Sequence, residues 1–159
     1  MTELAETFRG LGFDGVRTYL NSGNVIFSAS ATAETKLAGK IERSIEKDTG
    51  LAVSVLVLDD TAVRSIVAAI PKAWVTDATV RTDVLFLWPE VDEPGVLERL
   101  PRNPEVDDVR YTPGAVIWRI DRANANRSRE ARFVGTPLYK RMTIRNANTT
   151  RKLHELLSG

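Results

Sequence analysis

Apolar residues recur every three to four positions in several stretches of this 159-residue chain, which is the spacing of one face of an α-helix. Leu37, Ile41 and Ile45 form a clear stripe of this kind, with charged residues between them. The spacing and the capping residues predict four main helices, from Thr2 to Gly12, from Thr32 to Gly50, from Asp60 to Pro71 and from Thr149 to Leu157. Shorter helices are predicted at Asp92–Leu100 and Asn124–Arg132, and Asn148 is predicted to cap the last helix.

Runs of apolar and β-branched residues predict the strands. These runs lie at Val16–Leu20, Asn24–Ser28, Val53–Leu58, Thr82–Trp88, Val106–Tyr111 and Ala115–Ile120. The turn sequences Asn21-Ser22-Gly23-Asn24 and Thr112-Pro113-Gly114 predict that two pairs of these strands are hairpins. Val53–Leu58 is almost continuously apolar, which predicts a strand covered on both faces.

The order of these elements predicts an α+β fold built from two tandem ferredoxin-like lobes. The second half begins strand-helix-strand-strand-helix, and the first half has the ferredoxin-like order without its leading β-strand. Residues 71–81 show no clear periodicity and mark the expected seam. We therefore expect an N-terminal ferredoxin-like lobe over residues 1–75 and a C-terminal α+β lobe with a basic tail over residues 76–159.

Composition excludes several classes of chemistry. The chain has no cysteine, which excludes disulfides, thiolate nucleophiles and cysteine-ligated metals. The net charge is +1, so the overall balance implies no polyanion partner. The N-terminus lacks the pattern of a signal peptide, and the longest apolar runs are too short to span a bilayer. We expect a soluble, cytoplasmic protein with no membrane partner.

Positive charge is concentrated between Arg122 and Lys152, where only Glu130 opposes it. The basic residues of this tail are Arg122, Arg127, Arg129, Arg132, Lys140, Arg141, Arg145, Arg151 and Lys152. Such a segment could hold a phosphate, a nucleotide or nucleic acid, because arginine binds phosphate oxygens in a two-pronged fashion. It could equally be a solvated basic edge, or pair with acids such as Glu93 and Glu98 within the molecule.

Candidate ligand-binding residues follow from this concentration and from the start of the last helix, whose free amides favour an anion. They are Arg127, Arg129, Arg145, Asn146, Asn148, Thr149 and Arg151. Simple capping of the helix by Asn148 or Thr149 is the alternative. The exposed turn Asn21, Ser22, Gly23 and Asn24 is a second candidate, which could instead be only a turn.

The sequence predicts no catalytic residue, no metal site and no cofactor. His154 is the only histidine, and no acid is placed beside it. Asp107 and Asp108 are adjacent and are interpreted as loop residues, because neighbouring residues of a strand point to opposite faces. Trp118 is predicted in the core, and Trp74 at a surface or subunit contact.

Several segments together resemble the family known as domain of unknown function 1697. They are the hairpin Arg17–Ser28, the strand Val84–Trp88, and the tail segments Asn126–Arg129 and Thr143–Leu153. Ala147 stands where the family usually has tryptophan. The resemblance implies a strand ahead of the first helix, which this sequence lacks. Without it, we expect unpaired backbone along one side of Val25–Phe27 or Val53–Leu58.

These observations favour a non-enzymatic binding module that holds a phosphate-bearing small molecule or nucleic acid through its basic C-terminal region. The alternative is a structural protein that associates with itself, as a homodimer, through an exposed sheet edge and has no catalytic activity. An enzyme ranks below both, because no catalytic constellation is visible.

Overall fold

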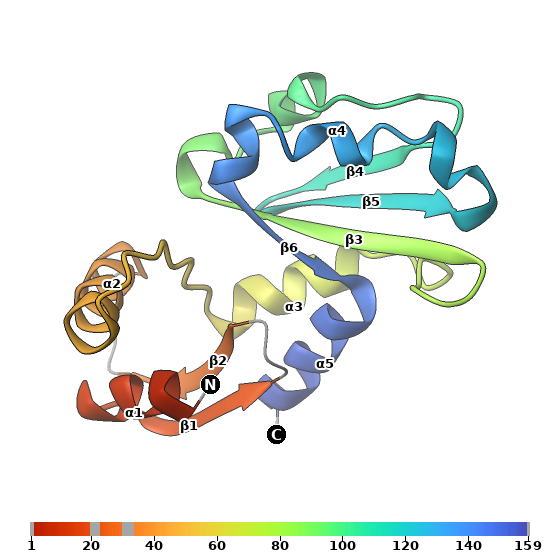
Figure 1. Cartoon of the computed structure of the whole chain (residues 1–159). Coiled ribbons are helices and arrows are strands. Elements are labelled where there is room, and N and C mark those ends of the chain that lie inside the picture. The colour runs from red at the N-terminus through yellow and green to blue at the C-terminus, as the bar shows by residue number, and fades with distance from the viewer. Residues whose placement is uncertain (1, 20–22, 30–33, 159) are drawn as a thin grey trace. The chain divides into compact units, whose positions relative to one another are not determined.

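A computed structural model describes residues 2–19, 23–29 and 34–158 of the chain. It confirms an α+β fold with two separate sheets (Figure 1). Two compact units are present, one formed by residues 1–59 with 156–159 and the other by residues 60–155. No helix within the described ranges is long and apolar enough to cross a membrane. The division of the sequence at residue 75 stays a prediction.

The first unit contains α1 (Thr2–Gly10), β1 (Asp14–Tyr19), β2 (Asn24–Ser28) and α2 (Glu34–Thr49). The strands pair antiparallel, with Thr18 opposite Val25, so the predicted hairpin is confirmed. Gly12 adopts a φ of 84°, which is favourable for glycine, and its N–H donates to the Arg9 carbonyl at 2.9 Å. This turn ends α1 and lets the chain reverse into β1.

Three phenylalanines fill the core of the first unit. Phe13 stacks on Phe27 with 4.6 Å between ring centres, and Phe8 meets Phe27 edge to face at 5.2 Å. Ile41 and Ile45 of α2 pack into the same cluster, as the helical stripe predicts. Side chains brought by α1, both strands and α2 therefore share one apolar core.

The predicted strand Val53–Leu58 is wrong, because residues 51–59 form neither helix nor strand. Leu51 is 63% exposed and Val53 is 42% exposed, whereas Val55 and Val57 pack against the core cluster. Some of the apolar side chains are partly buried, but the backbone of this segment does not pair with a strand. Within the described ranges β2 pairs with β1 alone, in line with the expected open edge.

The second unit is built on a four-stranded antiparallel sheet in the order β4-β5-β3-β6. Its strands are β3 (Val80–Leu87), β4 (Asp108–Thr112), β5 (Ala115–Asp121) and β6 (Met142–Asn146). The helix α3 (Asp60–Ala69) and most of α5 (Ala147–Ser158), up to Glu155, complete it. The strand β6 was not predicted, because its sequence Met-Thr-Ile-Arg-Asn is short and largely polar. An edge strand needs to bury only part of its surface.

Short helical turns link the strands of this sheet. They are η1 (Pro89–Val91), η2 (Pro94–Arg99), η3 (Arg122–Arg127), α4 (Glu130–Phe133) and η4 (Pro137–Arg141). The helix predicted at Asp92–Leu100 is instead largely the 3₁₀ turn η2. Proline begins both η1 and η2 and cannot donate a backbone hydrogen bond, so the segment divides into short turns.

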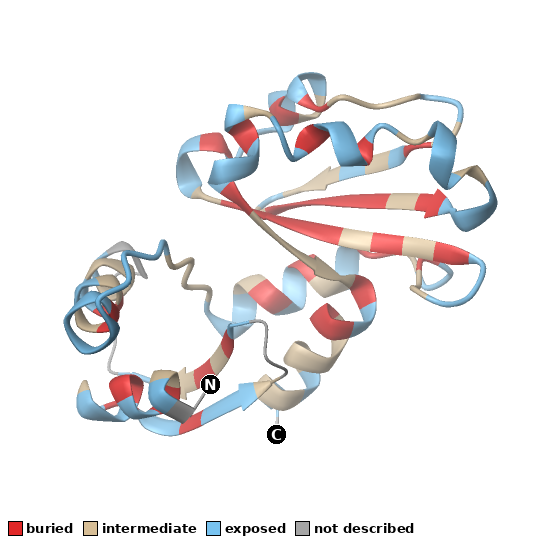
Figure 2. Ribbon diagram, in the orientation of Figure 1, coloured by how far each residue is buried: buried red, intermediate tan, exposed pale blue. Residues whose placement is uncertain are grey.

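The central strands β3 and β5 are buried along most of their length (Figure 2). Leu85, Val116 and Trp118 belong to a cluster closed by residues of the connecting turns, including Phe133. Trp118 is fully buried, as predicted. Trp74, predicted at a surface, is only 7% exposed, because the Arg110 guanidinium lies 4.6 Å from its ring centre and the chain packs around it.

Candidate functional site

Asp107 is the anchor of a polar network inside the second unit. It is 4% exposed and accepts four hydrogen bonds. Its Oδ1 receives the Trp118 Nε1–H at 3.0 Å and the Ser128 hydroxyl at 2.5 Å. Its Oδ2 receives the backbone N–H of Asn103 at 2.7 Å and of Arg129 at 3.0 Å. The carboxylate thus joins the core strand β5 to the segment that leads into α4.

These bonds decide the charge of Asp107. Burial opposes ionisation, but the bonds from Arg129, Asn103, Ser128 and Trp118 outweigh it and hold the pKa of Asp107 below its ordinary value. Asp107 is therefore ionised near neutral pH. A buried carboxylate that accepts four donors is fully satisfied and fixes the backbone around it.

The segment 126–130 is held by further bonds around this anchor. Asn103 Nδ2 donates to the Arg127 carbonyl at 3.1 Å, and the Arg127 guanidinium lies 2.6 Å from a carboxylate oxygen of Glu105. The Ser128 hydroxyl also accepts the backbone N–H of Glu130 at 3.1 Å. The structure therefore brings the predicted residues Arg127 and Arg129 together on one fastened stretch of chain.

Glu130, the one acid of the basic tail, faces inward. Its side chain is 9% exposed, and the Arg81 guanidinium lies 2.7 Å from its Oε1. Arg81 also approaches Asp83, with Nε 3.4 Å from Oδ2. Burial, and then the hydrogen bond with Asp83, raise the pKa of Glu130 to about 8 against the opposing effect of Arg81. We therefore expect Glu130 to hold its proton near neutral pH.

The cations on either side of Glu130 face outward. Arg127, Arg129, Arg132, Lys140 and Arg141 are all exposed, and together they are called the basic surface below. Arg127 pairs with Glu105, and Arg141 lies 3.4 Å from Glu90. In the part of the chain that the structure describes, Arg129, Arg132 and Lys140 have no carboxylate at ion-pairing distance.

The other predicted binding residues gather at the junction of β6 and α5. Asn146 Oδ1 accepts the backbone N–H of Thr149 at 2.8 Å, so Asn146 caps α5 and the predicted cap at Asn148 is wrong. The helix begins two residues earlier than predicted, which moves the cap by the same amount. Thr149 and Thr150 are buried, and the Thr150 hydroxyl donates to the Asn146 carbonyl.

Asn148 and Arg151 bind backbone of their own chain. Asn148 Nδ2 donates to the Thr76 carbonyl at 2.7 Å. Arg151 donates from Nη1 to the Trp74 carbonyl at 2.9 Å and from Nη2 to the Pro71 carbonyl at 3.1 Å. These bonds fasten the segment that follows α3 to the start of α5. Both polar side chains therefore have structural partners at this junction.

Arg145 is half-buried on β6. Its Nη1 donates to the Thr143 hydroxyl at 3.0 Å and to the Ile144 carbonyl at 2.8 Å. Burial lowers the pKa of Arg145 from its usual value, although an arginine stays protonated at neutral pH. The guanidinium thus lies along the strand that carries it.

The loop candidate lies partly outside the described residues, since Asn21 and Ser22 do. Gly23 adopts a φ of 82°, which supports the turn interpretation. Asn24 is 7% exposed, and its Nδ2 donates to the Tyr19 carbonyl at 3.0 Å. This bond closes the hairpin.

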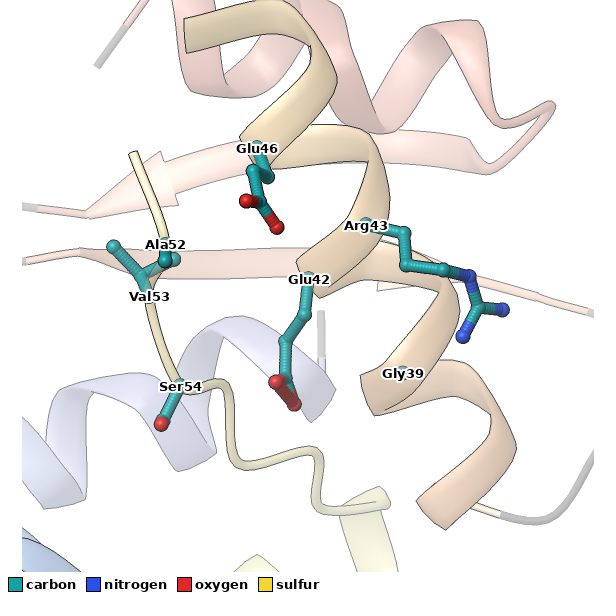
Figure 3. Close-up of a pocket in the computed structure, with 7 residues that line it drawn as sticks. All are labelled: Gly39, Glu42, Arg43, Glu46, Ala52, Val53 and Ser54. Atoms are coloured by element: carbon teal, nitrogen blue, oxygen red, sulfur yellow. The ribbon is translucent and has the colours of Figure 1, made fainter. Parts of the chain in front are cut away.

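A shallow, largely open hollow of about 360 Å³ lies in the first unit, between α2 and residues 52–54 (Figure 3). Glu42, Glu46, Val53 and Ser54 line it, and Arg43 points its guanidinium away from residues 52–54. The two carboxylates make this hollow unfavourable for a phosphate.

Comparison with known proteins places the chain in a family. The model of the family described as "Protein of unknown function (DUF1697)" matches residues 1–118, well over half of the sequence. The chain belongs to the DUF1697 family. None of the curated proteins compared with it matches it. The expected resemblance is confirmed, and no activity comes with it.

A solved structure shares the fold of this DUF1697 protein. It is a conserved bacterial protein from Streptococcus pneumoniae, with a TM-score of 0.82 and 23% sequence identity. The alignment covers 100% of this chain and 89% of that one. At this identity the likeness concerns the fold alone.

Sequence reasoning missed the inner part of the site in this DUF1697 chain. Asp107 was interpreted as a loop residue, and Arg81 and Asp83 were not singled out. Their partners lie far along the chain, since Arg81 meets Glu130 and Asp107 meets Ser128. The sequence does contain one indication of Glu130, because it is the one acid between Arg122 and Lys152 and an acid in such a segment can pair with a cation inside the fold.

Proposed function

We propose that this protein is a binding module for a phosphate-bearing ligand or nucleic acid, which it contacts through the basic surface. The observation that carries the proposal is the inward orientation of Glu130 against Arg81, at 2.7 Å. The acid of the tail is thereby removed from solvent, while the neighbouring cations remain on the outside. Three of these five cations then have no carboxylate partner among the described residues, which supports anion binding.

Arg129, Arg132 and Lys140 are the central residues of the proposed contact. They are exposed, and none of them has a carboxylate partner among the described residues. Arg127 and Arg141 form ion pairs, but exposed pairs are weak and exchange readily for a phosphate. Five other predicted residues contribute less directly, because the hydrogen bonds described above hold β6, the start of α5 and the segment after α3. They are Arg145, Asn146, Asn148, Thr149 and Arg151.

Binding to fluorescently labelled oligonucleotides, single-stranded and duplex, tests the proposal by fluorescence anisotropy over a series of salt concentrations. We expect the logarithm of the binding constant to fall linearly with the logarithm of salt, by about 0.9 for each phosphate of a duplex that the protein neutralises. Tripolyphosphate, added as a competitor and in thermal-shift assays, tests whether a short phosphate-bearing ligand suffices.

The combined variant Arg129→Gln, Arg132→Gln, Lys140→Gln should weaken binding and flatten the salt dependence. Its matched control is Lys36→Gln, Arg43→Gln, Lys47→Gln, which removes three exposed cations of α2 and changes the net charge equally. Equal loss in both variants would mean that only overall charge matters. No binding by the wild type at low salt would refute the proposed function.

The finer fold prediction also remains a proposal. The strand order β4-β5-β3-β6, with β3 and β5 central, supports a ferredoxin-like second unit. The first unit would be a related lobe without its leading strand, in which residues 51–59 take the place of a further strand beside the two-stranded sheet.

A second candidate function is self-association through the free edge of β2. Two observations favour it. Within the described ranges β2 pairs with one strand only, and the apolar residues 51–59 do not pair with any strand. The proposed occupant is β2 of a second copy, which would extend the sheet across a twofold axis. Sedimentation over a wide concentration range should then show a dimer, and hydrogen exchange should show protected amides in β2. A monomer at every concentration would exclude this candidate.

A further inference from the structure

We infer that Asp107 is a positioning residue for phosphate recognition, because it fixes the backbone from which Arg127 and Arg129 reach the ligand. The inference rests on the proposed function. Asp107 itself does not touch the ligand, since it is buried beneath residues 128 and 129. Its role is to hold the stretch of backbone from which the two guanidinium groups extend.

Asp107 joins this segment to the core and to a neighbouring turn. Trp118, which donates to Asp107, is fully buried on the central strand β5. Of the other three bonds, one comes from the N–H of Asn103, and two come from the fastened segment, through the Ser128 hydroxyl and the Arg129 N–H. A backbone segment that is already ordered loses less entropy on binding, which favours affinity.

The bonds of this segment also indicate how a phosphate is recognised. The N–H of Ser128 donates to the Ala125 carbonyl, that of Arg129 to Asp107, and that of Glu130 to the Ser128 hydroxyl. These amides are occupied and do not form a phosphate-binding nest. Recognition therefore falls to the guanidinium groups, whose paired N–H donors fit two oxygens of one phosphate.

Removing the charge of Asp107 has opposite expected effects on binding under electrostatic repulsion and under positioning, which makes the inference testable. Asp107 carries a negative charge beneath a surface proposed to bind anions. If that charge acted only by repulsion, its removal would strengthen binding. If Asp107 positions the segment, the isosteric change Asp107→Asn weakens binding despite the loss of repulsion, because the new amide group cannot accept the bonds made by one carboxylate oxygen.

The experiment compares Asp107→Asn with the wild type in the same oligonucleotide binding assay. We expect affinity to fall by about tenfold, as for the loss of one charge-assisted hydrogen bond. The fall should disappear when both proteins also carry Arg127→Gln and Arg129→Gln, since the two positioned groups are then absent. Unchanged or tighter binding by Asp107→Asn, while the wild type binds, overturns the inference alone. Failure of the wild type to bind overturns the proposed function as well.

Two further variants separate positioning from general destabilisation. Trp118→Phe removes the one bond from β5 to Asp107 and leaves those from Asn103, Ser128 and Arg129, so it should lower the melting temperature while affinity is kept. Ser128→Ala removes the bond on the side of the basic surface and should lower affinity with a smaller change in melting temperature. If affinity falls in proportion to stability in both variants, Asp107 is only structural. Ser128→Ala also provides the test if Asp107→Asn does not fold.

Discussion

Arg81 donates a hydrogen bond to Glu130 that joins β3 to α4, with Nη2 2.7 Å from Oε1. Asp83 lies beside the same guanidinium, so two carboxyl groups share one arginine. Burial opposes the charge of Arg81, but Glu130 and then Asp83 outweigh it and raise the pKa of Arg81 further. Arg81 stays charged, and the group whose protonation varies with pH is Glu130.

The pKa of Glu130, raised to about 8, predicts a pH dependence of stability. The folded state holds this proton between the usual glutamate pKa and about 8, whereas the unfolded state has released it. The contribution of protonated Glu130 to the free energy of unfolding is therefore fully present below the usual glutamate pKa, and it is lost as pH rises through about 8. Urea unfolding should show a free energy of unfolding that falls over this range.

The variant Glu130→Gln tests this pH dependence, because glutamine has the same shape and does not titrate. The pH dependence of the free energy of unfolding that is due to Glu130 should vanish. The stability of the variant relative to the wild type should therefore increase as pH rises. Asp77 and Asp107, whose pKa values are lowered, change stability only at more acidic pH. An unchanged slope in Glu130→Gln would assign the pH dependence to other groups.

Arg151→Ala should destabilise the second unit by about 1.5–3 kcal/mol, the range for hydrogen bonds that involve a charged group. The change leaves the carbonyls of Trp74 and Pro71 without their donor. Arg132→Ala is the matched control, since it removes an exposed arginine and should alter the free energy of unfolding little. Equal urea midpoints for the two variants would contradict the structural role of Arg151.

Asn146→Ala should lower the free energy of unfolding by about 1 kcal/mol, because α5 loses the acceptor for the Thr149 N–H. Asn146→Asp keeps an acceptor at the helix N-terminus and should retain most of the stability. The free energy of unfolding, measured by urea titration followed by circular dichroism, compares the two. A similar loss in both variants would show that a donor of Asn146, rather than the cap, is needed.

Gly114→Ala should destabilise the turn between β4 and β5 by about 1–2 kcal/mol. Gly114 has a φ of 93°, and an added Cβ would lie 3.2 Å from Ile66 Cδ1 on α3. Gly135→Ala is a suitable control, since a Cβ there would meet nothing closer than 4.0 Å. A melting temperature for Gly114→Ala equal to that of Gly135→Ala would mean that the turn adapts without strain.

The elements predicted best are those whose signal is local. The hairpin at Gly23, the stripe of α2 and the buried strands β3 and β5 follow from periodicity, turn chemistry and apolar content. Val53–Leu58 has the same apolar signal, yet it is not a strand, because a strand also needs a neighbour to share its hydrogen bonds. Sequence shows the side chains of such a segment but not its missing partner.

The candidate site was predictable only in part, for a related reason. The concentration of arginine is visible in the sequence, whereas the direction of each side chain depends on tertiary contacts. Arg129 faces solvent and Arg151 binds two carbonyls, although both belong to the same basic run. The role of Asp107 is not visible in the sequence, because the donors Trp118 and Ser128 come from other segments of the chain.

The place of β6 in the sheet affects how the protein is made. Leu85 of β3 lies opposite Ile144 of β6, so one side of an early strand is completed by a late one. On the ribosome, β3 emerges well before residues 142–146 exist, and its apolar flank stays uncovered during that delay. The four-stranded sheet of a newly made chain therefore cannot be completed before β6 has been synthesised, and until then one edge of β3 is open to misassociation.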